Sequence, residues 1–198
     1  MIRADLVTVY HNDEYYDLHL TLFDAVKKVE VAGGFQLIGV DNRRVNRGFA
    51  AACNLGALHP NAKAPVIGFL NPDVRVEGAF INRVAATLDS TTVITGCRYG
   101  KPDLELRTWG VRNWVCGAAL FVDRRWFESV GGFDERFVWS WEETDLIRQA
   151  ETSGLICKPI NLPIYHDSPT QNTEADATYK NYHFTQGEKR YRSKWRGR

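Results

Sequence analysis

The chain lacks the glycine-rich signatures that would assign its function directly. Its 198 residues contain neither the G-x-G-x-x-G pattern of dinucleotide sites nor the G-x-x-x-x-G-K-[ST] pattern of P-loops. These absences argue against the usual NAD-dependent and P-loop nucleotide enzymes. No internal repeat and no low-complexity linker divides the chain, and its length fits one domain rather than two.

Cysteine pairs and long apolar runs are also missing. The four cysteines show no C-x-x-C spacing, and their apolar neighbours predict small buried thiols rather than disulfides or a zinc site. No apolar run approaches the length of a membrane span, and the first residues do not form the apolar region of a signal peptide. We therefore expect a protein that is not transmembrane and that resides in the reducing cytoplasm.

The chain has almost no net charge, but many of its positive residues are concentrated at the C-terminal end. The formal net charge is only +1, yet six cations fall within the last ten residues. We expect a compact domain over residues 1–174 and a basic C-terminal helix or tail over residues 175–198. A solvated terminal helix is the commonest explanation of such a run. The alternative is a segment that binds an anionic surface, whether a membrane, a nucleic acid or an acidic partner.

Strand and helix patterns alternate along the rest of the chain, which predicts an α/β fold with three layers and a mostly parallel central sheet. Asp123 is placed to cap a short helix that ends at Gly131-Gly132. Two short extended segments flank Pro163. The other expected strands are residues 6–10, 35–40, 66–70, 92–97 and 115–122, and the other expected helices are residues 18–31, 48–58, 77–88 and 142–153.

An acidic turn follows the most apolar of these strands. Asn71-Pro72-Asp73 comes directly after residues 66–70, so Asp73 is delivered to the carboxyl edge of the sheet, where open α/β folds bind ligands. Pro72 disfavours helical geometry at Asn71 and keeps this approach extended. Mg²⁺ and Mn²⁺ prefer carboxylate oxygens and often bridge a diphosphate. The tripeptide is therefore a candidate metal site, with a simple turn as the alternative.

A second acidic cluster opens the helix expected at residues 142–153. Glu142, Glu143 and Asp145 are candidates for a general base, but Glu143 is rotated by about 100° from Glu142, so only part of the cluster can face one site. The alternative is a capping box in which Glu143 bonds back to the amide of Ser140. Acidic residues in a first turn are also favoured by the helix dipole. The local pattern alone favours capping.

Other candidates lie at the ends of strands and in loops. His166 and His11 each follow an apolar strand and are either metal or phosphate ligands or structural histidines. In Asn46-Arg47-Gly48, Gly48 permits close approach of a ligand to the backbone, and Arg47 could pair with a phosphate. Trp139 and Trp141 alternate around Ser140 in an aromatic-rich loop. We expect at least one of these two rings to face a cleft.

Taken in order, these segments resemble the family 2 glycosyltransferases of the GT-A fold, especially the rhamnosyltransferase-like branch. The resemblance covers residues from about 5 to 168. The segments that carry it are VTVYHN (7–12), NRGFAAACNLG (46–56), FLNPDV (69–74), GAALFV (117–122), GGFDERF (131–137) and WEETDL (141–146), followed by His166.

The resemblance implies a Rossmann-like GT-A domain and inverting transfer of a sugar from a nucleotide-diphosphate donor, a UDP- or dTDP-sugar, with Mn²⁺ or Mg²⁺. Asp73 matches the last acid of the family's metal-binding motif, and His166 matches a histidine near the metal. Glu143 falls where the family usually has the aspartate of its catalytic pair, with Glu142 and Asp145 as the neighbouring candidates. The implied donor-binding residues are Tyr10, Asn12, Asp41, Arg47, Gly48, Asn71 and Asp73, and the implied acceptor-binding residues are Trp139, Trp141 and Gly117.

Two departures from the family pattern keep other functions open. The catalytic pair reads Glu142-Glu143, and the segment between the first strand and Asn46 is too short for the usual two strand-helix units. One alternative is a non-catalytic module of the same fold that binds a sugar nucleotide or a glycan. Another is a nucleotidyltransferase, which would release pyrophosphate. The sequence leaves the acceptor open among glycans, lipid-linked molecules, proteins and nucleic acids.

Overall fold

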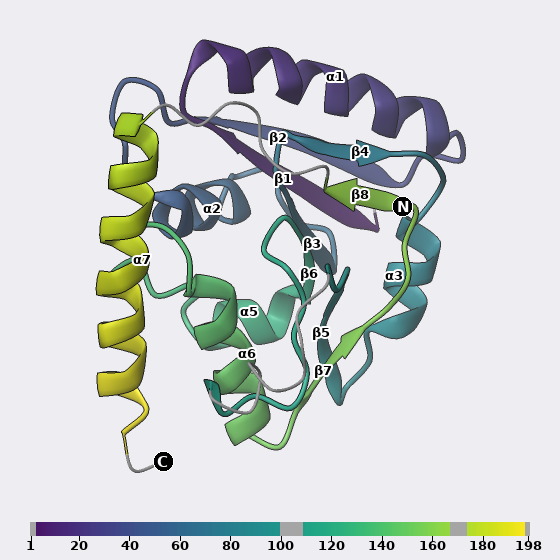
Figure 1. Ribbon diagram of the computed structural model, residues 1–198. Helices are drawn as coiled ribbons and strands as arrows, with labels where there is room; N and C mark the ends of the chain where they lie inside the picture. Colours follow the sequence, from purple (N-terminus) through teal and green to yellow (C-terminus); the bar gives the residue numbers. More distant parts are fainter. Residues whose placement is uncertain (1–2, 100–108, 167–173, 197–198) are drawn as a thin grey trace.

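The computed structural model describes residues 3–99, 109–166 and 174–196. A six-stranded sheet in the order β2-β1-β3-β6-β5-β7 forms its centre (Figure 1). Strand β6 is antiparallel to both of its neighbours, and the other pairings are parallel. The expected mostly parallel sheet is therefore confirmed. The strands are β1 (Ala4–Tyr10), β2 (Phe35–Asp41), β3 (Val66–Leu70), β5 (Thr92–Gly96), β6 (Ala119–Asp123) and β7 (Ile156–Pro159).

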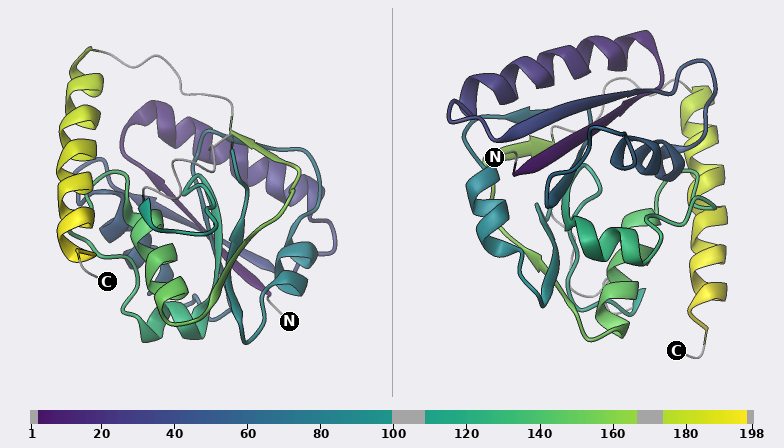
Figure 2. Two further views of the ribbon diagram at one scale, coloured as in Figure 1. Left: turned by 60° about the horizontal axis from the view of Figure 1, so that its bottom comes forward. Right: turned by 180° about the vertical axis from the view of Figure 1, so that it is seen from behind.

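Helices cover both faces of this sheet, which gives the three layers expected from the sequence (Figure 2). Every residue of β1 and β3 is buried, because strands covered on both faces expose neither set of side chains. The helices on one face are α1 (Asp13–Val29) and α3 (Ile81–Thr87), and those on the other are α2 (Phe49–Ala57), α5 (Arg124–Ser129) and α6 (Glu142–Thr152).

A small second sheet corrects part of the sequence prediction. The helix expected over residues 77–88 begins only at Ile81, and a strand that was not predicted, β4 (Val74–Val76), precedes it. Strand β4 pairs antiparallel with β8 (Ile164–His166). The strand expected over residues 115–122 likewise begins later, at Ala119.

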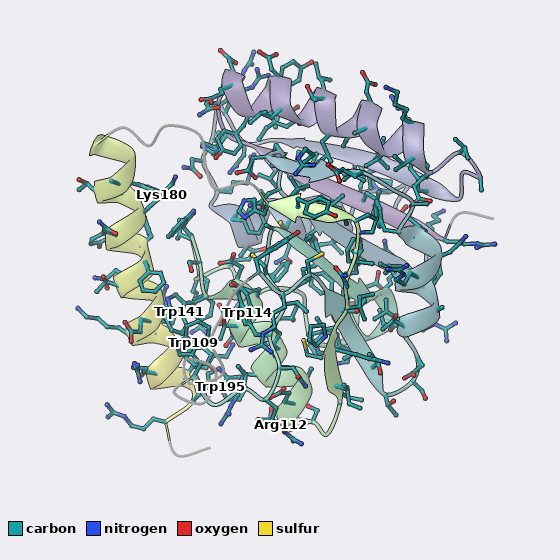
Figure 3. All side chains as sticks on the ribbon, turned by 45° about the vertical axis from the view of Figure 1, so that its right-hand side comes forward. Trp109, Arg112, Trp114, Trp141, Lys180 and Trp195 are labelled. Carbon is teal, nitrogen blue, oxygen red and sulfur yellow. The ribbon has the colours of Figure 1, made fainter. Side chains whose placement is uncertain are left out.

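The basic C-terminal segment forms helix α7 (Glu174–Lys194), which stands along the edge of the domain (Figure 1). Its C-terminal half packs on the domain, where Trp109, Trp141 and Trp195 lie beside it (Figure 3). Tyr191 is buried there, and its hydroxyl donates a hydrogen bond to the carbonyl of Trp109. Among the helices described, none is long and apolar enough to cross a membrane.

The four cysteines are free thiols, and Cys53, Cys97 and Cys157 are buried, as their apolar neighbours predict. Burial raises the pKa of the Cys53 thiol well above its ordinary value. These side chains therefore act as small apolar groups in the core.

Candidate active site

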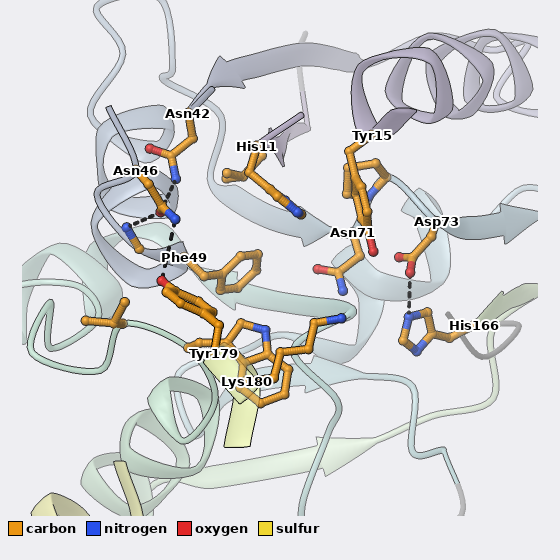
Figure 4. A pocket seen from close by; sticks show the side chains of 15 residues that line it. His11, Tyr15, Asn42, Asn46, Phe49, Asn71, Asp73, His166, Tyr179 and Lys180 are labelled. Carbon is orange, nitrogen blue, oxygen red and sulfur yellow. Dashed lines mark hydrogen bonds and ion pairs between the residues drawn. The ribbon is translucent and has the colours of Figure 1, made fainter. Parts of the chain in front are cut away.

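A cavity of about 400 Å³ opens at the carboxyl ends of β1 and β3 (Figure 4). Three parts of the chain form its walls: the sheet edge, the loops after β2 and before α6, and the N-terminal half of α7. The lining residues are Val9, His11, Tyr15, Asn42, Asn46, Gly48, Phe49, Asn71, Pro72, Asp73, Val138, Trp139, His166, Tyr179 and Lys180.

Asp73 and His166 meet at one end of this cavity. The pairing of Val74 with His166 in the small sheet brings them together across 93 positions of sequence. Nε2 of His166 lies 3.3 Å from Oδ2 of Asp73. The other carboxylate oxygen, Oδ1 of Asp73, is buried and has no hydrogen-bond partner among the described residues. A buried carboxylate oxygen left in this state costs free energy unless a ligand satisfies it.

The two side chains fit a divalent cation. Carboxylate oxygen and imidazole nitrogen both suit Mn²⁺, and neighbouring ligands that each lie about 2.1 Å from an octahedral ion are about 3 Å apart. The 3.3 Å separation is close to this spacing. The described residues contain no group of three or more His, Cys, Asp and Glu side chains that could hold a metal. Such a site is complete only when a ligand such as a diphosphate supplies further oxygens.

The loop between β2 and α2 forms the opposite end of the cavity. Oδ1 of Asn46 accepts hydrogen bonds from the Asn42 side chain at 3.3 Å and from the Gly48 amide at 3.0 Å. Gly48 has φ of 81°, and a Cβ there would lie 2.9 Å from the carbonyl oxygen of Val138. Glycine thus lets this loop pack against the loop before α6, and both loops line the cavity.

Several lining residues were not predicted from the sequence. Tyr15 lies in the first turn of α1, where its ring contacts that of His11 at a centroid distance of 4.4 Å. Phe49 begins α2. Tyr179 and Lys180 come from α7, where no local pattern indicates a binding site. Only the packing of α7 on the domain brings them to the cavity.

Four predicted donor-binding residues lie outside the cavity lining and have other contacts. Asn12 caps α1 by accepting a 2.8 Å hydrogen bond from the Tyr15 amide. Tyr10 is buried and stacks on His19. Asp41 is hydrogen-bonded to Arg43, which lowers the pKa of that carboxyl to about 2. Arg47 uses its guanidinium to bond the carbonyl of Val45. Gly48, Asn71 and Asp73 do line the cavity.

The structure contradicts a free catalytic role for Asp145. Its carboxylate is fully buried and accepts three hydrogen bonds, from Gln149 at 2.9 Å, from Lys194 at 2.8 Å and from Trp195 at 2.9 Å. Lys194 also bonds Asp134 at 3.0 Å. Asp145 therefore anchors the C-terminal end of α7 to α6, and its acceptor capacity is occupied by that contact.

The predicted capping box at the start of α6 is wrong. Trp141, not Ser140, is the N-cap residue, and no side chain caps the helix. Ser140 has φ of 65° and Trp141 has φ of 77°. Such left-handed backbone geometry is uncommon for residues other than glycine. This geometry turns Trp139 into the cavity lining and buries Trp141 against Phe137 and Tyr191.

Glu142 and Glu143 are buried side by side beneath Gly117, and neither is part of the cavity lining. A Cβ at Gly117 would lie 3.8 Å from Oε1 of Glu142 and 3.8 Å from Cδ of Glu143. Burial, and then the charge of Glu143, raise the pKa of Glu142 well above its ordinary value. Glu142 therefore keeps its proton to higher pH than an exposed glutamate does.

Comparison with known proteins identifies the fold. No family model and no curated protein matches the sequence. Solved structures do match. A mannosyltransferase from Pyrobaculum calidifontis, solved in complex with GDP-Man and Mn²⁺, superposes with a TM-score of 0.69 at 15% identity over 95% of this chain. The chain has a GT-A fold. The GT-A fold expected from the sequence is thus confirmed.

Two further GT-A structures extend this likeness. Mannosyl-3-phosphoglycerate synthase from Rubrobacter xylanophilus gives a TM-score of 0.61 at 11% identity, over 98% of this chain and 74% of that one. Drosophila β1,4-galactosyltransferase 7 in complex with xylobiose gives 0.60 at 14% identity, over 91% and 80%. The chain spans 63% of the Pyrobaculum mannosyltransferase. At these identities the likeness concerns the fold.

Proposed function

We propose that this GT-A protein is a glycosyltransferase that uses a nucleotide-diphosphate sugar and a divalent cation, Mn²⁺ or Mg²⁺, held by Asp73 and His166. The observation that carries the proposal is the buried Oδ1 of Asp73, which lacks a partner among the described residues at the end of β3. Solved structures of the same fold support it, because two of them contain Mn²⁺ with GDP-Man or with UDP-Gal.

Asp73 and His166 would hold the cation through one carboxylate and one imidazole. When bound, a divalent cation neutralises the charge that develops on the departing diphosphate. The cavity places aromatic walls from Phe49, Tyr179 and Trp139 around the remaining volume. Such rings are common platforms for bases and sugars, and they exclude water from the reacting groups.

On the resemblance of the sequence, we assign the reaction to the inverting class and the general base to Glu143, which is buried beside Gly117 outside the cavity lining. The acceptor hydroxyl attacks the anomeric carbon while its proton passes to the Glu143 carboxylate, and the bond from that carbon to the diphosphate oxygen breaks. The raised pKa of Glu142 speaks against Glu142 as the base, because burial disfavours the charged carboxylate that a general base needs. Trp139 and Gly117 are the residues beside which we place the acceptor, whereas Trp141 is buried.

The finer assignments follow the resemblance of the sequence. We place the protein in family 2 near the rhamnosyltransferase-like branch. The donor is then a UDP- or dTDP-linked hexose or rhamnose, and the location is the cytoplasm. The acceptor is a glycan, a lipid-linked molecule, a protein or a nucleic acid. The contacts of Lys194 with Asp134 and Asp145 reduce the positive charge that α7 can offer to an anionic surface.

The test is a panel of nucleotide sugars incubated with the protein and Mn²⁺, with the released nucleotide identified. We expect release of a nucleoside diphosphate, and loss of that release in Asp73→Asn. Asp24→Asn is the matched control, because Asp24 is an exposed carboxylate on α1 outside the cavity lining.

Three outcomes separate the alternatives. A second assay with a nucleoside triphosphate and a sugar phosphate tests for a nucleotidyltransferase, which would release pyrophosphate from the triphosphate. Binding of a nucleotide sugar without any turnover, including hydrolysis, identifies a non-catalytic module. Release that is the same in Asp73→Asn and in Asp24→Asn removes Asp73 from the reaction.

A further inference from the structure

Helix α7 contributes a cation to the cavity. Lys180 lines the cavity, and Figure 4 shows its side chain extending across it towards Asn71 and Asp73. Among the described lining residues it is the only lysine or arginine. A cavity that holds Asp73 at one wall therefore has a permanent positive charge at the wall facing it.

The position of Lys180 is fixed by packing two helical turns further along α7. A Cβ at Gly187 would lie 2.8 Å from Cδ1 of Trp141, so glycine lets the helix approach that ring closely. Lys194 and Trp195 then bond the buried carboxylate of Asp145. Seven residues separate Gly187 from Lys180, which is a helical distance of about 10 Å.

A second contact holds the N-terminal half of α7 at the cavity. The side-chain nitrogen of Asn46 donates a hydrogen bond to the hydroxyl of Tyr179 at 3.5 Å. Tyr179 precedes Lys180 in the sequence, and Asn46 belongs to the loop that forms the far end of the cavity. The helix is therefore attached at the cavity through Tyr179 and, further along, through Gly187 and Lys194.

Charge balance indicates what Lys180 binds. The proposed site joins one negative charge from Asp73, two negative charges on a donor diphosphate and two positive charges on the cation, so one negative charge remains. One lysine neutralises this remainder, and it is placed for the further charge that appears when the sugar leaves. The described residues offer the cation no group of three or more His, Cys, Asp or Glu ligands, so a further positive group at the diphosphate is favoured.

We propose that Lys180 of α7 binds the diphosphate of the nucleotide donor, opposite Asp73 and His166. This inference rests on the proposed function. It assigns part of the donor site to the C-terminal helix, which the sequence shows only as a basic segment. Leaving-group stabilisation is then shared between the sheet edge and α7.

The test compares nucleoside diphosphates with nucleoside monophosphates. UDP, GDP and dTDP, and the matching monophosphates, are titrated calorimetrically with Mn²⁺ into the full chain and into Lys180→Met, Lys180→Arg and Lys189→Met. Lys189 is an exposed lysine on the same helix outside the cavity, so Lys189→Met is the matched control. Denaturant unfolding of each variant shows whether it folds like the parent.

We expect Lys180→Met to weaken diphosphate binding about tenfold or more, the usual effect of losing a charged hydrogen bond. Monophosphate binding should change less, Lys180→Arg should restore most of the affinity, and Lys189→Met should bind like the parent chain. A parent chain that binds no diphosphate overturns this inference and the proposed function together.

Two other results overturn only the role of Lys180. One is equal diphosphate affinity in the parent chain and in Lys180→Met. The other is an equal loss for monophosphate and diphosphate, which would make Lys180 a structural residue of the cavity wall. In both cases Mn²⁺-dependent binding that is still lost in Asp73→Asn leaves the proposed function standing.

Discussion

The carboxylates of Asp73 and Asp145 are both largely shielded from solvent, but their surroundings differ. Asp145 accepts hydrogen bonds from Gln149, Lys194 and Trp195. Asp73 has one contact, with His166, and a second oxygen that lacks a partner among the described residues. The first aspartate is satisfied by the protein, whereas one oxygen of the second is left for a water or a ligand to satisfy.

This difference shows that acidity and burial alone do not identify an active-site carboxylate. Both aspartates follow similar sequence patterns, since each stands in an acidic cluster beside an apolar element. What separates them is the partner supplied from a distant part of the chain. The predictions below test this distinction, from the largest expected effect to the smallest.

The largest effect is expected at Glu143, the proposed general base. Because burial disfavours the charged form of Glu142, Glu142→Gln removes a poorer candidate base and should leave transfer largely intact. Glu143→Gln removes the base and should lower transfer about 10²- to 10⁴-fold. Steady-state rates of both variants with one nucleotide sugar check this, and a larger loss in Glu142→Gln would reverse the assignment.

The second prediction tests the satisfied carboxylate. Asp145→Ala leaves Lys194 and Trp195 without their buried acceptor, so the free energy of unfolding should fall by about 3 kcal/mol. Lys194→Met removes the partly exposed partner of the Lys194–Asp145 ion pair, so it should lower the free energy of unfolding less than Asp145→Ala does. Chemical denaturation followed by tryptophan fluorescence measures both. An unchanged midpoint for Asp145→Ala would mean that α7 is not anchored through this residue.

His19 is a buried group whose ring nitrogens lack hydrogen-bond partners among the described residues, and it lies outside the cavity lining. Burial lowers the pKa of His19. It faces the rings of Tyr10, Tyr16 and Phe23, and Arg43 lies over the two tyrosines.

In the unfolded chain, His19 binds a proton once the pH falls below about 6.5, its ordinary pKa. In the folded protein, His19 binds that proton only at lower pH. The stability that this residue contributes is fully present above about pH 6.5 and should fall as the pH drops below that value. His19→Phe should remove this pH dependence and leave nucleotide binding unchanged. Loss of binding in His19→Phe would show that this residue belongs to the site.

The smallest effect on stability is expected at Asp73. Asp73→Asn removes an incompletely satisfied buried charge, so the free energy of unfolding should change by less than about 1 kcal/mol. The same denaturation experiment that detects Asp145→Ala measures it. A loss comparable to that of Asp145→Ala would mean that Asp73 has a structural role, and the comparison between the two aspartates would fail.

Much of the fold was predictable because its signals are local. The strand at Val66–Leu70 has the predicted bounds, and Asp123 caps the short helix α5 as the sequence indicates. Strand β4 (Val74–Val76) was missed because it is stabilised by pairing with β8, a partner about 90 positions away. Local patterns carry no information about such a partner.

The candidate site was predictable only in part for the same reason. Asp73 could be placed at the sheet edge from its strand, but its contact with His166 depends on pairing in the small sheet. The occupation of Asp145 by Lys194, and the arrival of Lys180 at the cavity, depend on the packing of α7. The capping box failed because Ser140 and Trp141 adopt left-handed geometry, which their residue types disfavour.

The most direct test of the central claim is the binding of Mn²⁺ itself in the presence of a nucleoside diphosphate. Electron paramagnetic resonance measures the free Mn²⁺ signal as the protein is added, for the parent chain, Asp73→Asn and the control Asp24→Asn. The account predicts that the parent chain and the control deplete free Mn²⁺ beyond the nucleotide alone, and that Asp73→Asn does not. Equal depletion by all three proteins would contradict it.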